Sequence, residues 1–168
     1  EMQRSLVGSE MCIRDSCSTI ANRGWFITPH VVKDIHGAEM PADLLKRRTP
    51  TVATHWYGDV AEGMRMAVTG GTCRRAAMPD FEAAGKTGTA QNPHGKDHSA
   101  FMGFAPYENP RIAVAVYVEN GGWGATFGVP IGSLVMEKYL RGSISPERKY
   151  LEEQMLNSSI IYASPKKK

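Results

Sequence analysis

The stretch Gly85-Lys86-Thr87-Gly88-Thr89 carries the residues of this chain that are best suited to chemistry. Threonine is β-branched and an apolar hairpin follows, so the stretch is predicted to form a strand. Side chains alternate along a strand, which places Lys86 on one face and Thr87 and Thr89 together on the other. Gly88 has no side chain and lets another backbone or a ligand approach closely. An ammonium group, two hydroxyls and unpaired backbone N–H groups at a strand edge suit a peptide-like ligand that ends in a carboxylate.

Two further strands are predicted to hold this one in place. They cover residues 98–105 and 112–118, and turns rich in proline, glycine and asparagine separate them. The last strand is apolar on both faces, with alanine dominating one of them. This pattern predicts a central strand whose small-residue face lies close under a helix.

Helices are predicted on both sides of these strands. One begins with a capping-box pattern at Asp59 and Glu62 and ends at Gly70-Gly71. Its buried face is predicted to consist of Val60, Met64, Ala67 and Val68. Another covers about 130–140, with an inner face of Ile131, Leu134, Val135 and Tyr139. Residues 17–22 are predicted to end a third helix, residues 30–35 to form a strand, and residues 36–58 to form a surface excursion. The predicted fold class is α+β, an antiparallel sheet flanked by helices.

The composition bounds the class of protein. The 168 residues suffice for one domain with a core, and the 42% hydrophobic and 22% charged content is typical of globular proteins. The net charge is +3, and the terminal Lys166-Lys167-Lys168 accounts for it, so no nucleic-acid partner is predicted. The chain contains no run of 18 apolar residues.

The chain is predicted to have three parts. Residues 1–16 show no periodicity that joins the next segment, and residues 5–15 resemble a translated sequencing adapter, so 1–16 are predicted to be a non-native leader. Residues 17–142 are predicted to be the folded part. Residues 143–168 are predicted to be a tail, with a short helix that starts at Ser145 and Pro146 and a mobile end beyond Asn157.

Other candidate residues leave alternatives open or carry no site. His94 and His98 flank a turn and lack a further ligand, so neither a metal nor a cofactor is predicted. Trp123, in a glycine-rich loop, either borders a ligand groove or is a structural aromatic. Cys17 and Cys73 either form a disulfide or remain free and buried.

Four ordered segments resemble the transpeptidase domain of class B penicillin-binding proteins. They are Lys86-Thr87-Gly88-Thr89-Ala90-Gln91, Phe101-Met102-Gly103-Phe104-Ala105-Pro106, residues 110–116, and Val118-Glu119-Asn120-Gly121-Gly122. Residues 19–24 fit the same family. The resemblance covers about 17–142, the C-terminal part of that domain, and is closest to the penicillin-binding protein 2 branch of the cell-elongation machinery. Lys-Thr-Gly is one of three signatures of active-serine penicillin-recognising enzymes.

The resemblance implies a serine β-lactamase-like fold and a peptidoglycan D,D-transpeptidase. Such an enzyme cross-links the cell wall by acyl transfer from stem peptides that end in D-Ala-D-Ala, and β-lactams acylate its serine. Lys86 would support the protonation network of that serine. Thr87, Gly88 and Thr89 would bind the substrate, the two hydroxyls holding its terminal carboxylate. The N–H of Thr89 would be one of two oxyanion-hole donors.

The chain also departs from the family pattern. It contains no Ser-x-Asn, and its single Ser-x-x-Lys, Ser164 to Lys167, lies beside a proline in the tail. A catalytic serine and lysine need a rigid helical turn to face each other, so this match is attributed to chance. In the family both motifs precede the Lys-Thr-Gly strand. The chain is therefore predicted to lack its nucleophile and to be inactive by itself.

The family further implies partners and a location. The implied partners are the lipid-linked peptidoglycan precursor, β-lactams and a membrane glycosyltransferase of the elongation complex. The implied location is the outer face of the cytoplasmic membrane. A non-catalytic β-lactam sensor on the same fold is the alternative, because fold does not fix function. A serine β-lactamase is less favoured, because residues 101–106 and 118–120 resemble the transpeptidase pattern.

Overall fold

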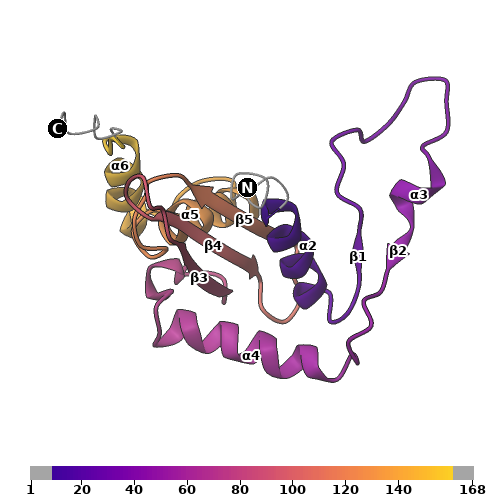
Figure 1. The fold of residues 1–168 in the computed structure, drawn as a ribbon, viewed down its shortest axis with the longest axis horizontal. Coiled ribbons are helices and arrows are strands. Elements are labelled where there is room, and N and C mark those ends of the chain that lie inside the picture. The colour runs from indigo at the N-terminus through magenta and orange to yellow at the C-terminus, as the bar shows by residue number, and fades with distance from the viewer. Residues whose placement is uncertain (1–8, 161–168) are drawn as a thin grey trace.

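The computed structural model describes residues 9–160 (Figure 1). Its centre is an antiparallel sheet of β3 (Ala84–Ala90), β4 (His98–Ala105) and β5 (Ile112–Val118), in that spatial order. Phe101 of β4 lies opposite Thr87 of β3 on one side and Val116 of β5 on the other. The predicted α+β fold, with an antiparallel sheet flanked by helices, is confirmed.

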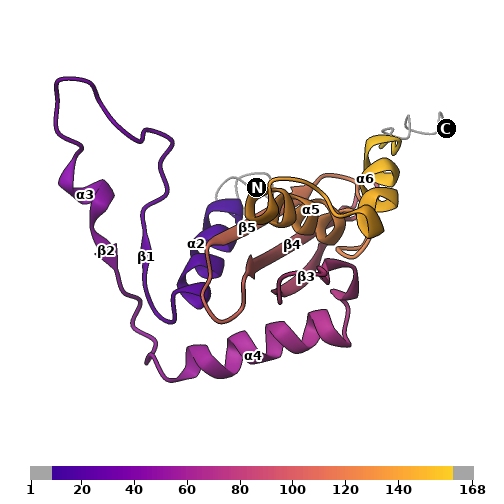
Figure 2. The same ribbon diagram turned by 180° about the vertical axis from the view of Figure 1, so that it is seen from behind.

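Helices cover both faces of the sheet. α2 (Ser9–Ala21) lies on one face and α5 (Gly128–Arg141) on the other, as the opposite views show (Figure 1, Figure 2). α4 (Trp56–Thr69) runs beside β3, and α6 (Lys149–Leu156) packs on α5 after a 3-10 turn, η2 (Pro146–Arg148). Within residues 9–160, no helix combines the length and the apolar character that crossing a membrane requires.

The alternation of side chains along β4 divides the core in two. Phe101 packs on the α5 side with Val129 and Met136, whereas Phe104 packs on the α2 side with residues that include Cys17. Both rings are almost fully buried. Burial of a phenylalanine ring stabilises a fold by about 1.5–3 kcal/mol, so these two rings fix the sheet between its helices.

β5 confirms one prediction and contradicts another. Its alanine face lies under a helix as expected, because Ala113 packs against the core cluster that α2 contributes to. The prediction that β5 is a central strand is wrong for the described sheet, because β4 is central and β5 lies at an edge. The apolar pattern on both faces follows from α2 on one side and α5 on the other, and requires no second neighbouring strand.

The buried face of α5 differs from the predicted one. Val135 and Tyr139 are 48% and 60% exposed, and the buried positions include Gly132, Ser133 and Glu137. α5 approaches the sheet at Gly132, where a Cβ atom would lie 2.5 Å from the Phe101 ring. The buried face of the helix therefore combines apolar side chains such as Met136 with a glycine and paired polar side chains, and an apolar periodicity does not detect the latter positions.

Predictions for the first half of the chain are corrected in two places. α2 runs unbroken from Ser9 to Ala21, so residues 9–16 are helical and continuous with 17–21. No strand occupies 30–35, where the only pairing is an isolated bridge from Ile35 to Ala38. Instead β1 (Phe26–Ile27) pairs with β2 (Arg47–Arg48), and together with the short α3 (Ala42–Leu45) they form an arm that extends from the body (Figure 1). The predicted surface excursion is confirmed for residues 36–55, most of which are exposed, whereas residues 56–58 already belong to α4 (Trp56–Thr69).

α4 begins at Trp56, three residues before the predicted capping residue, and ends at Gly70 as predicted. Glu62 does not cap the helix. It pairs with Arg65 at 2.6 Å and accepts a hydrogen bond from the Tyr107 hydroxyl at 3.1 Å. Met64 and Val68 are buried as expected, whereas Val60 is 46% exposed.

Candidate active site

The Lys-Thr-Gly-Thr stretch forms the middle of β3, as predicted. In the described part of the chain, β3 pairs with β4 alone, so it forms an edge of the sheet. Lys86 lies opposite Met102, on the α2 side, and Thr87 lies opposite Phe101, on the α5 side. The predicted division of these side chains between two faces is therefore present.

Lys86 is exposed, and its Nζ donates to the Thr87 carbonyl at 2.8 Å. A cavity of about 180 Å³ lies beside it, lined by Gly88 and Met102 and by Ile13 of α2. This hydrogen bond of the ammonium group is thus a local one, and Lys86 also lines this largely apolar cavity.

The hydroxyls of Thr87 and Thr89 are held by two different loops. Thr72, in the loop after α4, places its Oγ1 3.0 Å from Oγ1 of Thr87. The N–H of Gly124, in the loop after β5, donates to Thr89 Oγ1 at 3.3 Å. The positions of both hydroxyls therefore depend on segments remote in sequence.

Gly88 lies beneath the second of these loops. A Cβ atom on Gly124 would lie 2.4 Å from the Gly88 carbonyl oxygen and 2.6 Å from that of Ala100. The loop backbone therefore rests directly on the β3 and β4 backbones, which is the close approach that the absent side chain of Gly88 predicts.

Trp123 lies in the same loop and is 76% exposed. Its carbonyl accepts a hydrogen bond from Ser99 Oγ at 2.9 Å, and Ser99 Oγ accepts one from the Gly128 N–H at 3.0 Å. Ser99 is fully buried and ties the loop to the start of α5. The Trp123 backbone is thus fixed while its ring stands outside the core, a position compatible with the border of a groove.

The candidate histidines and cysteines form neither a metal site nor a disulfide among the described residues. His98 Nδ1 accepts from the Asn120 N–H at 3.1 Å, and His94 is exposed. Residues 9–160 contain no group of three or more His, Cys, Asp or Glu arranged to hold a metal. Cys17 and Cys73 are free and buried in separate clusters, which excludes the disulfide alternative. Burial raises the pKa of Cys17 to about 12 and also raises that of Cys73.

Three residues that shape this site were not predicted from the sequence: Thr72, Ser99 and Gly124. Thr72 follows Gly70-Gly71, which signalled only the end of a helix. Ser99 acts through its hydroxyl and Gly124 through its N–H, and the partners of both are remote in sequence. No local pattern distinguishes such residues from ordinary turn or strand positions.

The family model of the penicillin-binding protein transpeptidase domain matches residues 15–137, which includes all of β3, β4 and β5. This chain belongs to that family. It is 34% identical over 161 residues to the peptidoglycan D,D-transpeptidase MrdA of Haemophilus influenzae, covering 82% of this chain and 24% of the relative. The chain thus spans about a quarter of that relative's length.

Solved structures of the family match as well. The imipenem acyl-enzyme complex of penicillin-binding protein A from M. tuberculosis has a TM-score of 0.62 at 30% identity, over 76% of this chain and 29% of that one. Pseudomonas aeruginosa PBP2, in complex with WCK 5153, has a TM-score of 0.59 at 37% identity, over 77% and 29%. The recognised resemblance to penicillin-binding transpeptidases is confirmed.

Proposed function

We propose that this chain forms the C-terminal part of a peptidoglycan D,D-transpeptidase, and that β3 is one wall of its active site. The observation that carries the proposal is the edge strand with Lys86 on one face and two loop-held threonine hydroxyls on the other, in a chain of the transpeptidase family. The enzyme transfers an acyl group from a stem peptide that ends in D-Ala-D-Ala to a serine, and then to an acceptor amine. β-Lactams acylate the same serine.

Each of the four residues from Lys86 to Thr89 has a role in this proposal. The hydroxyls of Thr87 and Thr89 bind the carboxylate of the substrate, and Gly88 lets the substrate backbone approach. The Thr89 N–H donates to the oxyanion of the tetrahedral intermediate, and loss of such a donor costs about 10²–10³ in turnover. Lys86 supports proton transfer at a serine supplied by the Ser-x-x-Lys segment, outside this chain. Trp123 borders the groove.

The proposal extends to the surroundings of the enzyme. The domain faces the outer side of the cytoplasmic membrane, acts on the lipid-linked precursor and works with a membrane glycosyltransferase of the elongation complex. Residues 1–16 are a non-native leader in this proposal, even though residues 9–16 continue the α2 helix.

The test uses the full-length protein that carries this chain. It should be labelled by a fluorescent penicillin and should release D-Ala from a stem pentapeptide while joining the peptide to an acceptor. Lys86→Ala should abolish both reactions in a protein that still folds. Labelling without D-Ala release would favour the β-lactam sensor, and hydrolysis of penicillin within seconds would favour the β-lactamase.

A further inference from the structure

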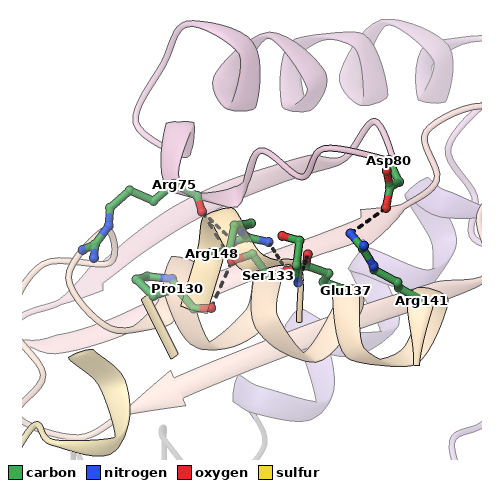
Figure 3. Close-up of polar contacts among 8 residues, drawn as sticks. Arg75, Asp80, Pro130, Ser133, Glu137, Arg141 and Arg148 are labelled. Carbon is green, nitrogen blue, oxygen red and sulfur yellow. Dashed lines mark hydrogen bonds and ion pairs between the residues drawn. The ribbon is translucent and has the colours of Figure 1, made fainter. Parts of the chain in front are cut away.

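A buried ion pair joins α5 to the segment after it. Arg148 Nη1 lies 2.9 Å from Glu137 Oε2, and the two side chains are 7% and 1% exposed (Figure 3). The second carboxylate oxygen of Glu137 accepts from the Ser145 N–H at 3.0 Å. Because both of its oxygens accept hydrogen bonds, the Glu137 carboxylate is held in one orientation opposite Arg148.

The remaining donors of Arg148 reach a different part of the chain. Its Nη2 donates to the Arg75 carbonyl at 3.0 Å and to Ser133 Oγ at 2.6 Å (Figure 3). Arg75 belongs to the 3-10 turn η1 (Arg74–Ala76), which lies between α4 and β3. Its side chain also donates to Gln154 of α6. A buried guanidinium thus holds one backbone carbonyl of this turn.

The turn transmits this restraint to Thr72. The Cys73 N–H donates to the Ala67 carbonyl at 2.9 Å, and the Ala76 N–H donates to the Cys73 carbonyl at 2.7 Å. Cys73 itself is fully buried. The segment from Thr72 to Ala76 is therefore fixed at both ends, and Thr72 Oγ1 lies 3.0 Å from Thr87 Oγ1.

We propose that Thr72 is a positioning residue for the carboxylate-binding hydroxyl of Thr87, and that Arg148 holds Thr72 in place through η1. This inference rests on the proposed function. Each hydroxyl has one proton, so when Thr87 donates to a bound carboxylate, its oxygen accepts the proton of Thr72. A hydroxyl that accepts a hydrogen bond becomes a better donor. Thr72 thus orients and strengthens the contact between Thr87 and the ligand.

Stability alone does not explain this arrangement. A buried ion pair is often no more stabilising than two apolar side chains of the same volume. Thr72 is exposed, so water would satisfy its hydroxyl if Thr87 did not. The network specifies the position of one hydroxyl at the proposed site.

The test compares Thr72→Val, Thr72→Ser and the matched control Thr69→Val in the full-length protein. Among the described residues, the hydrogen bond of the Thr69 hydroxyl is made within its own helix, to the Met66 carbonyl at 3.3 Å. The measurement is the ratio of acylation rate constants for benzylpenicillin and for its methyl ester, which lacks the carboxylate charge. Thr72→Val should lower this ratio about five-fold, the effect of one lost hydrogen bond, while Thr72→Ser and Thr69→Val retain it.

Arg148→Lys tests the remote contact. Lysine keeps a charge for Glu137 but lacks the planar fork that also reaches the Arg75 carbonyl. Arg148→Lys should lower the ratio of the two acylation rate constants. The double variant Arg148→Lys, Thr72→Val should have the same ratio as Thr72→Val alone. An unchanged ratio in Thr72→Val, or multiplying effects in the double variant, would overturn the inference. Failure of the unsubstituted protein to be acylated by either compound would instead overturn the proposed function.

Discussion

Gly124→Ala is expected to disturb the site through a backbone collision. The new Cβ would lie 2.4 Å from the Gly88 carbonyl oxygen, whereas real Cβ contacts do not fall below 3.0 Å, so the loop has to withdraw by about 0.6 Å. Neither obstructing atom belongs to a side chain that could rotate away, because the second contact, at 2.6 Å, is the Ala100 carbonyl oxygen.

The size of the effect follows from this displacement. Overpacking of this kind typically costs about 1–3 kcal/mol of stability. The hydrogen bond from the Gly124 N–H to Thr89 Oγ1 is already 3.3 Å long, so a shift of this size breaks it. A misplacement of about 1 Å near a reacting centre can cost about 10²-fold, so we expect acylation by penicillin to slow about tenfold.

The assay is the rate of labelling of the full-length protein by a fluorescent penicillin, with thermal unfolding measured in parallel. Gly70→Ala is the matched control, since no atom lies within 4 Å of its Cβ position and its φ of −143° suits alanine. Labelling of Gly124→Ala at the unsubstituted rate would refute the reasoning that this loop positions Thr89.

Three further predictions concern buried and paired groups. Glu137→Leu leaves the buried Arg148 charge without its partner and should cost about 3–5 kcal/mol in urea unfolding, whereas Glu137→Leu combined with Arg148→Met should cost much less. Because the pKa of Cys17 is raised from 9.0 to about 12 by burial, the fold favours the neutral thiol, and the free energy of unfolding should fall as pH rises from 9 towards 12. Cys17→Ala should make that slope shallower, and the remainder includes the contribution of Cys73, whose pKa burial also raises. The hydrogen bond from Arg65 lowers the pKa of Glu62 below 4.5, so stability present above pH 4.5 should decline as the pH falls below it, and less so in Glu62→Gln.

The sequence by itself determined the parts of this protein that depend on local pattern. The alternation along residues 84–90 placed Lys86 and Thr87 on opposite faces of a strand, and the turns on either side fixed the boundaries of β4 and β5. The glycine after Thr69 ended α4 where expected. These features follow from backbone preferences within a few residues, and the tertiary structure retains them.

The tertiary structure decided which surfaces meet. α5 packs through Val129 and Met136 but also through Gly132 and Glu137, because the Phe101 ring leaves no room for a Cβ at Gly132 and Arg148 neutralises the carboxylate of Glu137. The contacts that hold the site, from Thr72 to Thr87 and from Gly124 to Thr89, join positions 15 and 35 residues apart. Their formation depends on how distant elements pack, and the free energy of that packing is a property of the whole fold rather than of any local segment.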